Sequence, residues 1–128
     1  MTDRLSNDTN RDKINQTGLL RWKNMSGETI PAYACVKLSA FNDTGKYYDA
    51  VKPDGEGNLY FFNGGIAIAN NKYGESFIWG QSSVLGKTSG VFGETVGPVA
   101  DSWEMTTEGT GFTVFSNPAD GVAAILRE

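Results

Sequence analysis

The stretch GPVADSWEMTTEGTGFTVFS, residues 97–116, carries the strongest β-sheet signal in the sequence. Trp103 and Met105 alternate with polar residues in its first half, and Phe112 and Val114 do so in its second half. A period of two places alternate side chains on opposite faces of a sheet. The polar connection between the halves contains two glycines, which accept the positive φ angles of a short turn. We therefore predict a β-hairpin here, with Trp103 as the largest apolar side chain around which neighbouring strands pack.

The rest of the chain also shows sequence features typical of β-structure. It has 16 glycines among 128 residues, turn-forming residues recur at short intervals, and no window keeps a sustained helical period. This pattern predicts one all-β domain over residues 18–128, a small β-sandwich or β-barrel of antiparallel hairpins. Asn63-Gly64 lies between the apolar runs 59–62 and 65–69 and predicts a second hairpin, because both residues accept positive φ.

Further strands are predicted from alternation or from apolar runs at residues 19–24, 29–38, 47–51, 75–85 and 122–126. Cys35 lies among apolar neighbours in the second of these strands. We expect a small buried side chain there, because nothing near it in the sequence would lower the pKa of its thiol.

Residues 1–17 form a separate, polar block in which Leu5 and Ile14 are the main apolar residues. Such a segment cannot bury enough apolar surface to offset the entropy of ordering it. It is either a free tail or an extended arm that orders on a partner, and we favour the arm. The predicted anchors on that partner are Leu5, Ile14, Leu19 and Leu20.

The sequence contains no histidine and a single cysteine. This removes Ser-His-Asp and Cys-His catalysis, histidine-ligated metals, an internal disulfide and a thiolate cluster. The carboxylates lie in loops or on polar strand faces, and nothing places two of them across a cleft as glycoside hydrolysis requires. Residues 54–58 superficially resemble a calcium loop but lack its helical frame and terminal bidentate glutamate. We expect no enzymatic activity, no cofactor and no metal.

Net charge is −4 with a pI near 4.8, and the sequence has no basic patch of the kind that binds nucleic acid. No run of apolar residues is long enough for a transmembrane helix, and the polar N-terminus is unlike a signal peptide. We therefore expect no membrane partner and synthesis in a cell's cytoplasm.

Aromatic residues make up 12% of the chain and often stand next to one another. Tyr47-Tyr48, residues 60–62 and Phe77-Ile78-Trp79 place large aromatic or apolar side chains at consecutive positions, so some of them should point outward. Outward aromatic side chains on a sheet mark a protein interface or a sugar-binding surface. We favour the interface.

Several pieces of the chain occur in a recognisable order: Trp22-Lys23-Asn24-x-Ser26-Gly27-Glu28-x-Ile30-Pro31-Ala32-Tyr33-x-x-Val36, Gly65-Ile66-Ala67-Ile68, the turn at Gly74, Gly97-Pro98-x-x-x-Ser102-Trp103-x-Met105 and Gly109-x-Gly111-Phe112-x-Val114. In this order the sequence resembles small virion proteins that are encoded beside the capsid genes of tailed bacteriophages. The pieces span roughly residues 22–115 and leave out the N-terminal arm.

The resemblance implies a capsid decoration or cement protein on the virion surface, made in the host cytoplasm, which binds the major capsid protein and stabilises the head. It implies a homo-oligomer, with a trimer favoured, and no catalytic residues. The alternative is a fibre- or tail-associated module that attaches to a fibre or to a host glycan, with Trp79 or a tyrosine as the stacking platform.

Overall fold

The structure is a computed structural model that describes residues 19–77 and 84–128. The predicted arm, with Leu5 and Ile14, lies outside the described residues, and so does Trp79. The described residues form nine strands and no helix, so the predicted all-β class is confirmed. It follows that this part of the chain has no helix long and apolar enough to cross a membrane.

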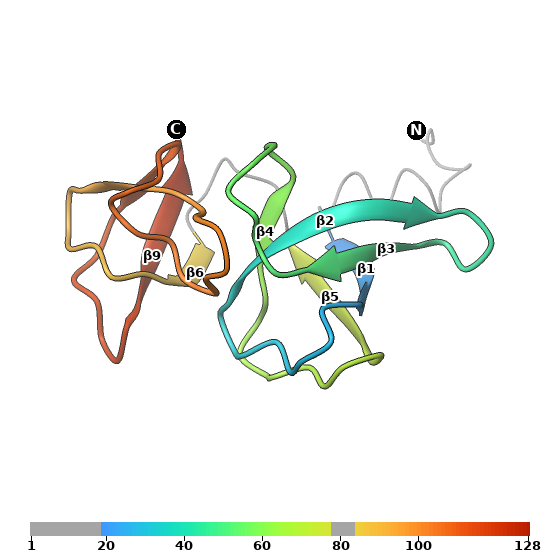
Figure 1. The fold of residues 1–128 in the computed structure, drawn as a ribbon. Coiled ribbons are helices and arrows are strands. Elements are labelled where there is room, and N and C mark those ends of the chain that lie inside the picture. The colour runs from blue at the N-terminus through green and yellow to red at the C-terminus, as the bar shows by residue number, and fades with distance from the viewer. Residues whose placement is uncertain (1–18, 78–83) are drawn as a thin grey trace, which may run out of the picture.

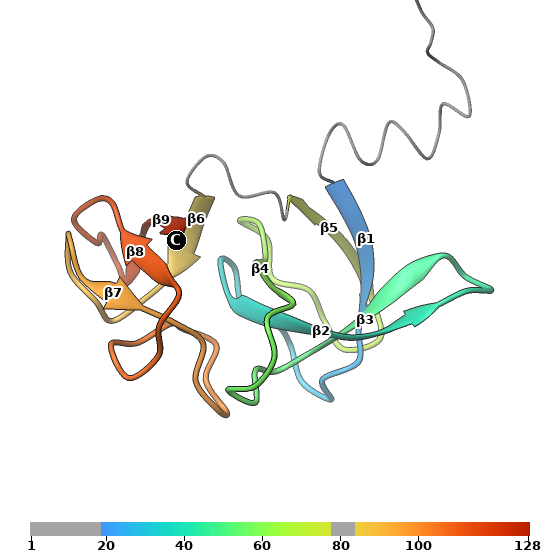
Figure 2. The same cartoon turned by 90° about the horizontal axis from the view of Figure 1, so that it is seen from above.

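The strands form two sheets that lie side by side (Figures 1 and 2). The first sheet has the order β4-β2-β3-β1-β5 and consists of β1 (Leu19–Asn24), β2 (Cys35–Asn42), β3 (Tyr47–Val51), β4 (Tyr60–Phe62) and β5 (Tyr73–Phe77). The second sheet has the order β6-β9-β8-β7 and consists of β6 (Val84–Lys87), β7 (Thr95–Val96), β8 (Phe112–Val114) and β9 (Val122–Arg127). All paired strands are antiparallel except β1 and β3, which are parallel.

The core of the described chain consists of two hydrophobic clusters. One belongs to the first sheet and contains Trp22, Ile30, Ala34, Val36, Leu38, Ala50 and Phe61. The other joins the sheets and contains Cys35, Tyr60, Phe62, Val96, Met105, Val114, Ala123 and Ile125. Strands β2 and β4 therefore contribute alternate side chains to both clusters. This is why all three aromatic residues of β4 are buried, and the expectation that one of them points outward is wrong.

Trp22, not Trp103, is the central aromatic residue of the first cluster. Its side chain is fully buried, and its Nε1 donates to the Ser76 Oγ at 3.0 Å. A Cβ atom on Gly74, directly opposite, would lie 2.5 Å from the indole Cζ2 atom, so this position has to be glycine. Trp103 only packs against the edge of the cluster as a partly buried residue. The strands of the first sheet therefore pack around Trp22, and the prediction that neighbouring strands pack around Trp103 is wrong.

The predicted hairpin over residues 97–116 does not form. Its second half is β8, which pairs with β7 on one side and β9 on the other. Because both edges of β8 are occupied, the first half pairs elsewhere: Met105 bridges Thr88, and Thr106 bridges Gly97. Met105 is nonetheless buried, as its alternation with polar neighbours predicts.

The predicted Asn63-Gly64 hairpin does not form either. The Asn63 side chain is buried, and its Nδ2 donates to the carbonyl oxygens of Pro31 and Ile66, both at 2.9 Å. Neither residue of the pair has a positive φ, so the backbone does not make the expected turn. Strand β4 pairs with β2 instead, and the following segment forms only a bridge between Ile68 and Ile30.

The other strand predictions hold with shifted bounds. Strands β1, β3 and β9 lie where the sequence predicts them, and the predicted strand over residues 75–85 is represented by β5 and β6. Strand β2 starts only at Cys35, because Tyr33 has a φ of +61°, which interrupts an extended backbone. Cys35 is fully buried as expected, and burial raises the pKa of its thiol to about 12.

Candidate functional site

The outer face of the first sheet carries two tyrosines and two cations. Because Trp22 points inward, its neighbours Arg21 and Lys23 point outward from β1. Tyr47 on β3 and Tyr73 on β5 flank them, with ring centroids 5.2 Å apart and ring planes at 86°. We call Arg21, Lys23, Tyr47 and Tyr73 the tyrosine face.

Each cation lies against an aromatic ring of the tyrosine face. The Arg21 guanidinium is 4.3 Å from the Tyr73 ring centroid. The Lys23 ammonium is 5.6 Å from the Tyr73 ring centroid and 6.0 Å from the Tyr47 ring centroid. Contacts of this kind contribute about 0.5–1 kcal/mol each when exposed. They also hold the rings in place before any partner arrives.

Consecutive tyrosines 47 and 48 point to opposite sides, as the sequence predicts. Tyr48 packs against the first cluster, and its ring lies 4.8 Å from that of Phe41. Tyr73, which the sequence did not single out as a binding residue, is 43% exposed. In the sequence, the sign of the tyrosine face was that Arg21 and Lys23 alternate with Trp22, which places the two cations together on one side of a strand.

Of the four predicted anchors, Leu20 is the one whose side chain the structure places, and it does not belong to the tyrosine face. Leu20 points to the opposite side from Arg21 and is partly buried against the first cluster. Leu19 opens β1 opposite Phe77. Whether these residues bind a partner stays a prediction, as it does for Leu5 and Ile14, which lie outside the described residues.

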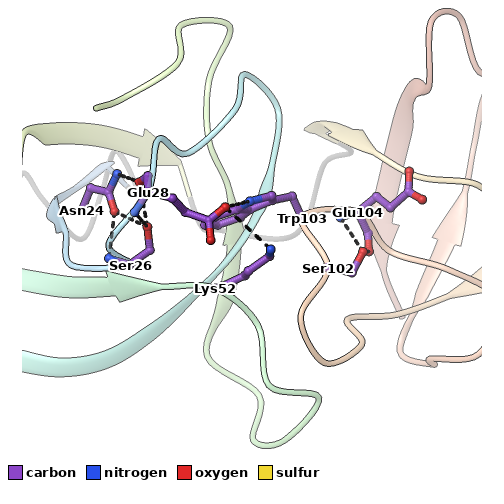
Figure 3. Close-up of polar contacts among 7 residues, drawn as sticks. All are labelled: Asn24, Ser26, Glu28, Lys52, Ser102, Trp103 and Glu104. Carbon is purple, nitrogen blue, oxygen red and sulfur yellow. Dashed lines mark hydrogen bonds and ion pairs between the residues drawn. The ribbon is translucent and has the colours of Figure 1, made fainter. Parts of the chain in front are cut away.

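A polar network around Trp103 connects the two sheets (Figure 3). The indole Nε1 donates to the Glu28 Oε1 at 3.1 Å, and the same oxygen lies 3.7 Å from the Lys52 Nζ. The Lys52 ammonium is 5.3 Å from the Trp103 ring centroid. The Trp103 carbonyl accepts a hydrogen bond from the Cys35 backbone N–H at 2.7 Å, at the start of β2. Trp103 thus fastens the loop before Met105 to the first sheet.

The loop that presents Glu28 is built around a buried asparagine (Figure 3). The Asn24 Nδ2 donates to the Glu28 carbonyl at 2.8 Å and to the Ile68 carbonyl at 2.9 Å. Its Oδ1 accepts hydrogen bonds from the Ser26 backbone N–H at 2.9 Å and from the Ser26 hydroxyl at 2.7 Å. Three of the sequence pieces on which the resemblance rests, those with Asn24, Ile68 and Trp103, therefore meet at this junction. Their polar residues act there in holding the fold, since Glu28 is already engaged by two partners.

The acidic loop after β3 is also internally paired. The Lys37 Nζ lies 2.9 Å and 2.7 Å from the two carboxylate oxygens of Asp54, and the Tyr60 hydroxyl lies 3.2 Å from one of them. The hydrogen bond from Lys37 lowers the pKa of Asp54 to about 2, with the Glu56 backbone N–H assisting. Burial raises the pKa of Tyr60 to about 12. The Asp54 carboxylate, which a calcium ion in this loop would need as a ligand, is therefore already paired with Lys37.

Within residues 19–77 and 84–128, no group of three or more acidic or cysteine side chains is placed to hold a metal ion. The tyrosine face brings aromatic rings and cations together on three neighbouring strands, which is a composition typical of binding surfaces. No protein-family model matches this sequence, and no significant match was found among curated proteins or solved structures.

Proposed function

We propose that this protein is a bacteriophage virion structural protein, a capsid decoration or cement protein that binds the major capsid protein and stabilises the head. The observation that carries the proposal is the tyrosine face. The order of sequence pieces that resembles small virion proteins supplies the identity of the partner.

The tyrosine face has the composition of a protein-binding surface. Tyrosine and arginine are enriched at interfaces and at the few positions that dominate binding energy. The side chains stand on three neighbouring strands, and the cation–π contacts restrict them in the free protein. A surface that is ordered beforehand loses less side-chain entropy on binding.

The N-terminal arm joins the chain at the start of β1, the strand that carries Arg21 and Lys23. In this proposal the arm reaches a neighbouring capsomer, while the tyrosine face contacts the capsid protein beneath it. Attachment at two points raises the overall affinity, because the second contact forms within one complex. Many symmetric copies on a shell would multiply this effect.

A fibre- or tail-associated module that binds a host glycan is the second candidate, and the exposure of Tyr73 favours it. Sugar rings stack on exposed aromatic faces. However, the Arg21 guanidinium lies over the Tyr73 ring, and a stacked sugar would have to displace it. This cost makes a protein partner the better fit. Binding of the purified chain to a glycan array, with loss in Tyr73→Ser, would instead establish the glycan module.

The test of the capsid proposal is co-sedimentation of the purified full-length chain with heads assembled from the major capsid protein of the same phage. The variant Arg21→Ser/Tyr73→Ser should bind at least tenfold more weakly, because it removes two residues of the type that costs about 1–2 kcal/mol or more each at an interface. Ile66→Ser is the matched control, since this residue is 76% exposed on a loop after β4 and outside the tyrosine face. Equal binding by the double variant and the control would refute this role of the tyrosine face.

The arm is tested separately in the full-length chain. Leu5→Ser/Ile14→Ser should weaken binding to the same heads, because it removes the two main apolar side chains of the arm. Undiminished binding would show that the arm is not an attachment segment. Failure of the wild-type chain to bind heads at all would reject the proposed function as a whole.

A further inference from the structure

Strand β9 has an apolar sequence on both of its faces. Residues 122–126 read Val-Ala-Ala-Ile-Leu without a polar residue, a pattern typical of strands covered on both sides. The inward side chains, Ala123 and Ile125, are each 1% exposed in the cluster between the sheets. The outward side chains, Val122, Ala124 and Leu126, are only partly covered within the described chain.

The neighbouring strands extend this apolar surface. Leu85 on β6 pairs with Ala124 and is 52% exposed. On the other side of β9, the Phe115 backbone N–H donates to the Ala124 carbonyl at 2.7 Å, and the Phe115 side chain is 49% exposed. Leu85, Ala124 and Phe115 thus form a row across the outside of the second sheet. We call Leu85, Phe115, Val122, Ala124 and Leu126 the outer apolar face.

Covering the outer apolar face would leave few polar groups without partners. The Thr113 hydroxyl, which points the same way, already donates to the Glu128 carboxylate at 2.6 Å. The charged groups on this side lie at its margins: Lys87 ends the edge strand β6, and Glu128, which follows β9, has its carboxylate against the Thr113 and Thr95 hydroxyls. Burying a sheet face is favourable when no hydrogen-bonding group on it is left without a partner.

We propose that a second copy of this chain covers the outer apolar face, with the two second sheets packed face to face about a two-fold axis. A two-fold contact uses the same patch on both copies, so the patch must match itself. A nearly uncharged apolar sheet face meets this requirement, and sheets pack on one another with interdigitated side chains. The observations that support this pairing are separate from those that support capsid binding, and the pairing predicts a dimer in place of the trimer that the resemblance favours.

The distribution of charge supports a second copy as the occupant. Each copy carries a net charge of −4, so two copies repel one another wherever acidic residues meet. The strands β6, β8 and β9 contain no aspartate or glutamate, and the Glu128 carboxylate beside them is already held by the Thr113 and Thr95 hydroxyls. Copies therefore approach here with less repulsion than at surfaces where several acidic residues meet. The N-terminal arm is a poorer occupant, because residues 1–17 are almost entirely polar.

The exposed area can be compared with that of a standard interface. Leu85 and Phe115 are 52% and 49% exposed. A phenylalanine buries about 150–250 Å² when fully covered, so the exposed half of Phe115 alone supplies roughly 100 Å². That is about an eighth of the roughly 800 Å² per partner of a standard interface, before Leu85 and the other aliphatic residues are counted.

Light scattering coupled to size-exclusion chromatography of the full-length chain tests the proposal. The mass should be twice the 13.8 kDa of one chain. Leu85→Glu/Phe115→Glu should give a monomer with an unchanged circular dichroism spectrum, because both side chains point away from the core. Its dimer dissociation constant should rise at least 100-fold, since pairing would bury unpaired charges. Tyr73→Ser, on the other sheet, is the control and should remain a dimer.

A second variant keeps the test decisive if the double glutamate variant does not fold. Ala124→Cys should form an intermolecular disulfide on oxidation, because Ala124 lies in the middle of the row, whereas the native Cys35 is buried and should not react. A wild-type monomer at all concentrations, a trimeric mass, or dimers of undiminished strength in Leu85→Glu/Phe115→Glu would each overturn the proposal. Loss of the dimer in Leu5→Ser/Ile14→Ser would assign the pairing to the arm and overturn it as well.

Discussion

Substitution of Gly109 by alanine should destabilise the fold through contact between two backbone segments. A Cβ atom at this position would lie 2.5 Å from the carbonyl carbon of Gly97 and 2.6 Å from its oxygen. Neither glycine has a positive φ, so the effect is one of space and not of backbone conformation. Because the obstructing atoms are backbone atoms, no change of rotamer relieves the contact.

The expected loss of stability follows from how far the backbone segments around Gly97 and Gly109 must separate. Gly97 and Thr106 exchange two backbone hydrogen bonds of 3.0 and 3.1 Å, and these hold the segments together. Separating the segments by about 1 Å weakens both bonds, each of which contributes about 0.5–1.5 kcal/mol. Strain from an added methyl group in a packed site typically costs 1–3 kcal/mol. We expect a loss of about 3 kcal/mol and, for a chain of this size, a fall in Tm on the order of 10 °C.

Urea denaturation and thermal melting of the purified chain measure this loss. Gly64→Ala is the matched control, since a Cβ atom there has no neighbour within 4 Å and its φ is not positive. This variant should be neutral, or more stable by about 0.4–1 kcal/mol through reduced freedom of the unfolded chain. If Gly109→Ala is as stable as Gly64→Ala, the inferred close packing of the two backbone segments is wrong.

Three other perturbations have defined outcomes. Ser76→Ala leaves the buried Trp22 N–H without an acceptor and should cost about 1–3 kcal/mol in urea denaturation. The Cys35 thiol, with its pKa raised to about 12, should not react with a thiol reagent at pH 8 until the chain is unfolded, as followed by mass spectrometry. Asp54 has a folded pKa of about 2, below its ordinary value of 3.8, so its pairing with Lys37 stabilises the fold above pH 4 and is lost as pH falls toward 2. Asp54→Asn should therefore flatten the pH dependence of unfolding in that window.

Local patterns in the sequence predicted individual strands well. Leu20 and Trp22 alternate with charged residues and lie in β1, and the apolar run after Gly121 forms β9. Such strands form mainly because one face is buried, and the alternation of apolar and polar residues shows directly which side chains belong to that face. The burial of Cys35 followed from its apolar neighbours for the same reason.

Pairing between strands was predicted poorly, because it depends on contacts far apart in the sequence. The Asn63 side chain reaches Pro31, 32 residues away, and that contact replaces the backbone turn which Asn-Gly favours in isolation. Strand β8 lies next to β9 rather than next to the segment that precedes it. A sequence with two apolar runs on either side of a turn therefore predicts two strands, but it does not establish which strand each of them pairs with.

The tyrosine face shows the same limit for the candidate site. Tyr47 and Tyr73 come from strands that are 26 positions apart and meet only because β1 lies between β3 and β5. No local motif contains both residues. What the sequence did contain was Arg21 and Lys23 on either side of a tryptophan, which identified one strand of the face without its flanking strands.

The two proposed surfaces lie on different sheets, and this makes their roles separable. A dimer joined through the outer apolar face would present two tyrosine faces, so its second attachment to a capsid would be intramolecular and could raise the overall affinity 10²–10⁴-fold. Leu85→Glu/Phe115→Glu should then bind heads on the order of 100-fold more weakly although its tyrosine face is intact. Arg21→Ser/Tyr73→Ser should bind weakly yet remain a dimer. If the monomeric variant binds heads as tightly as the wild type, copies attach one by one, and pairing through the second sheet has no part in attachment.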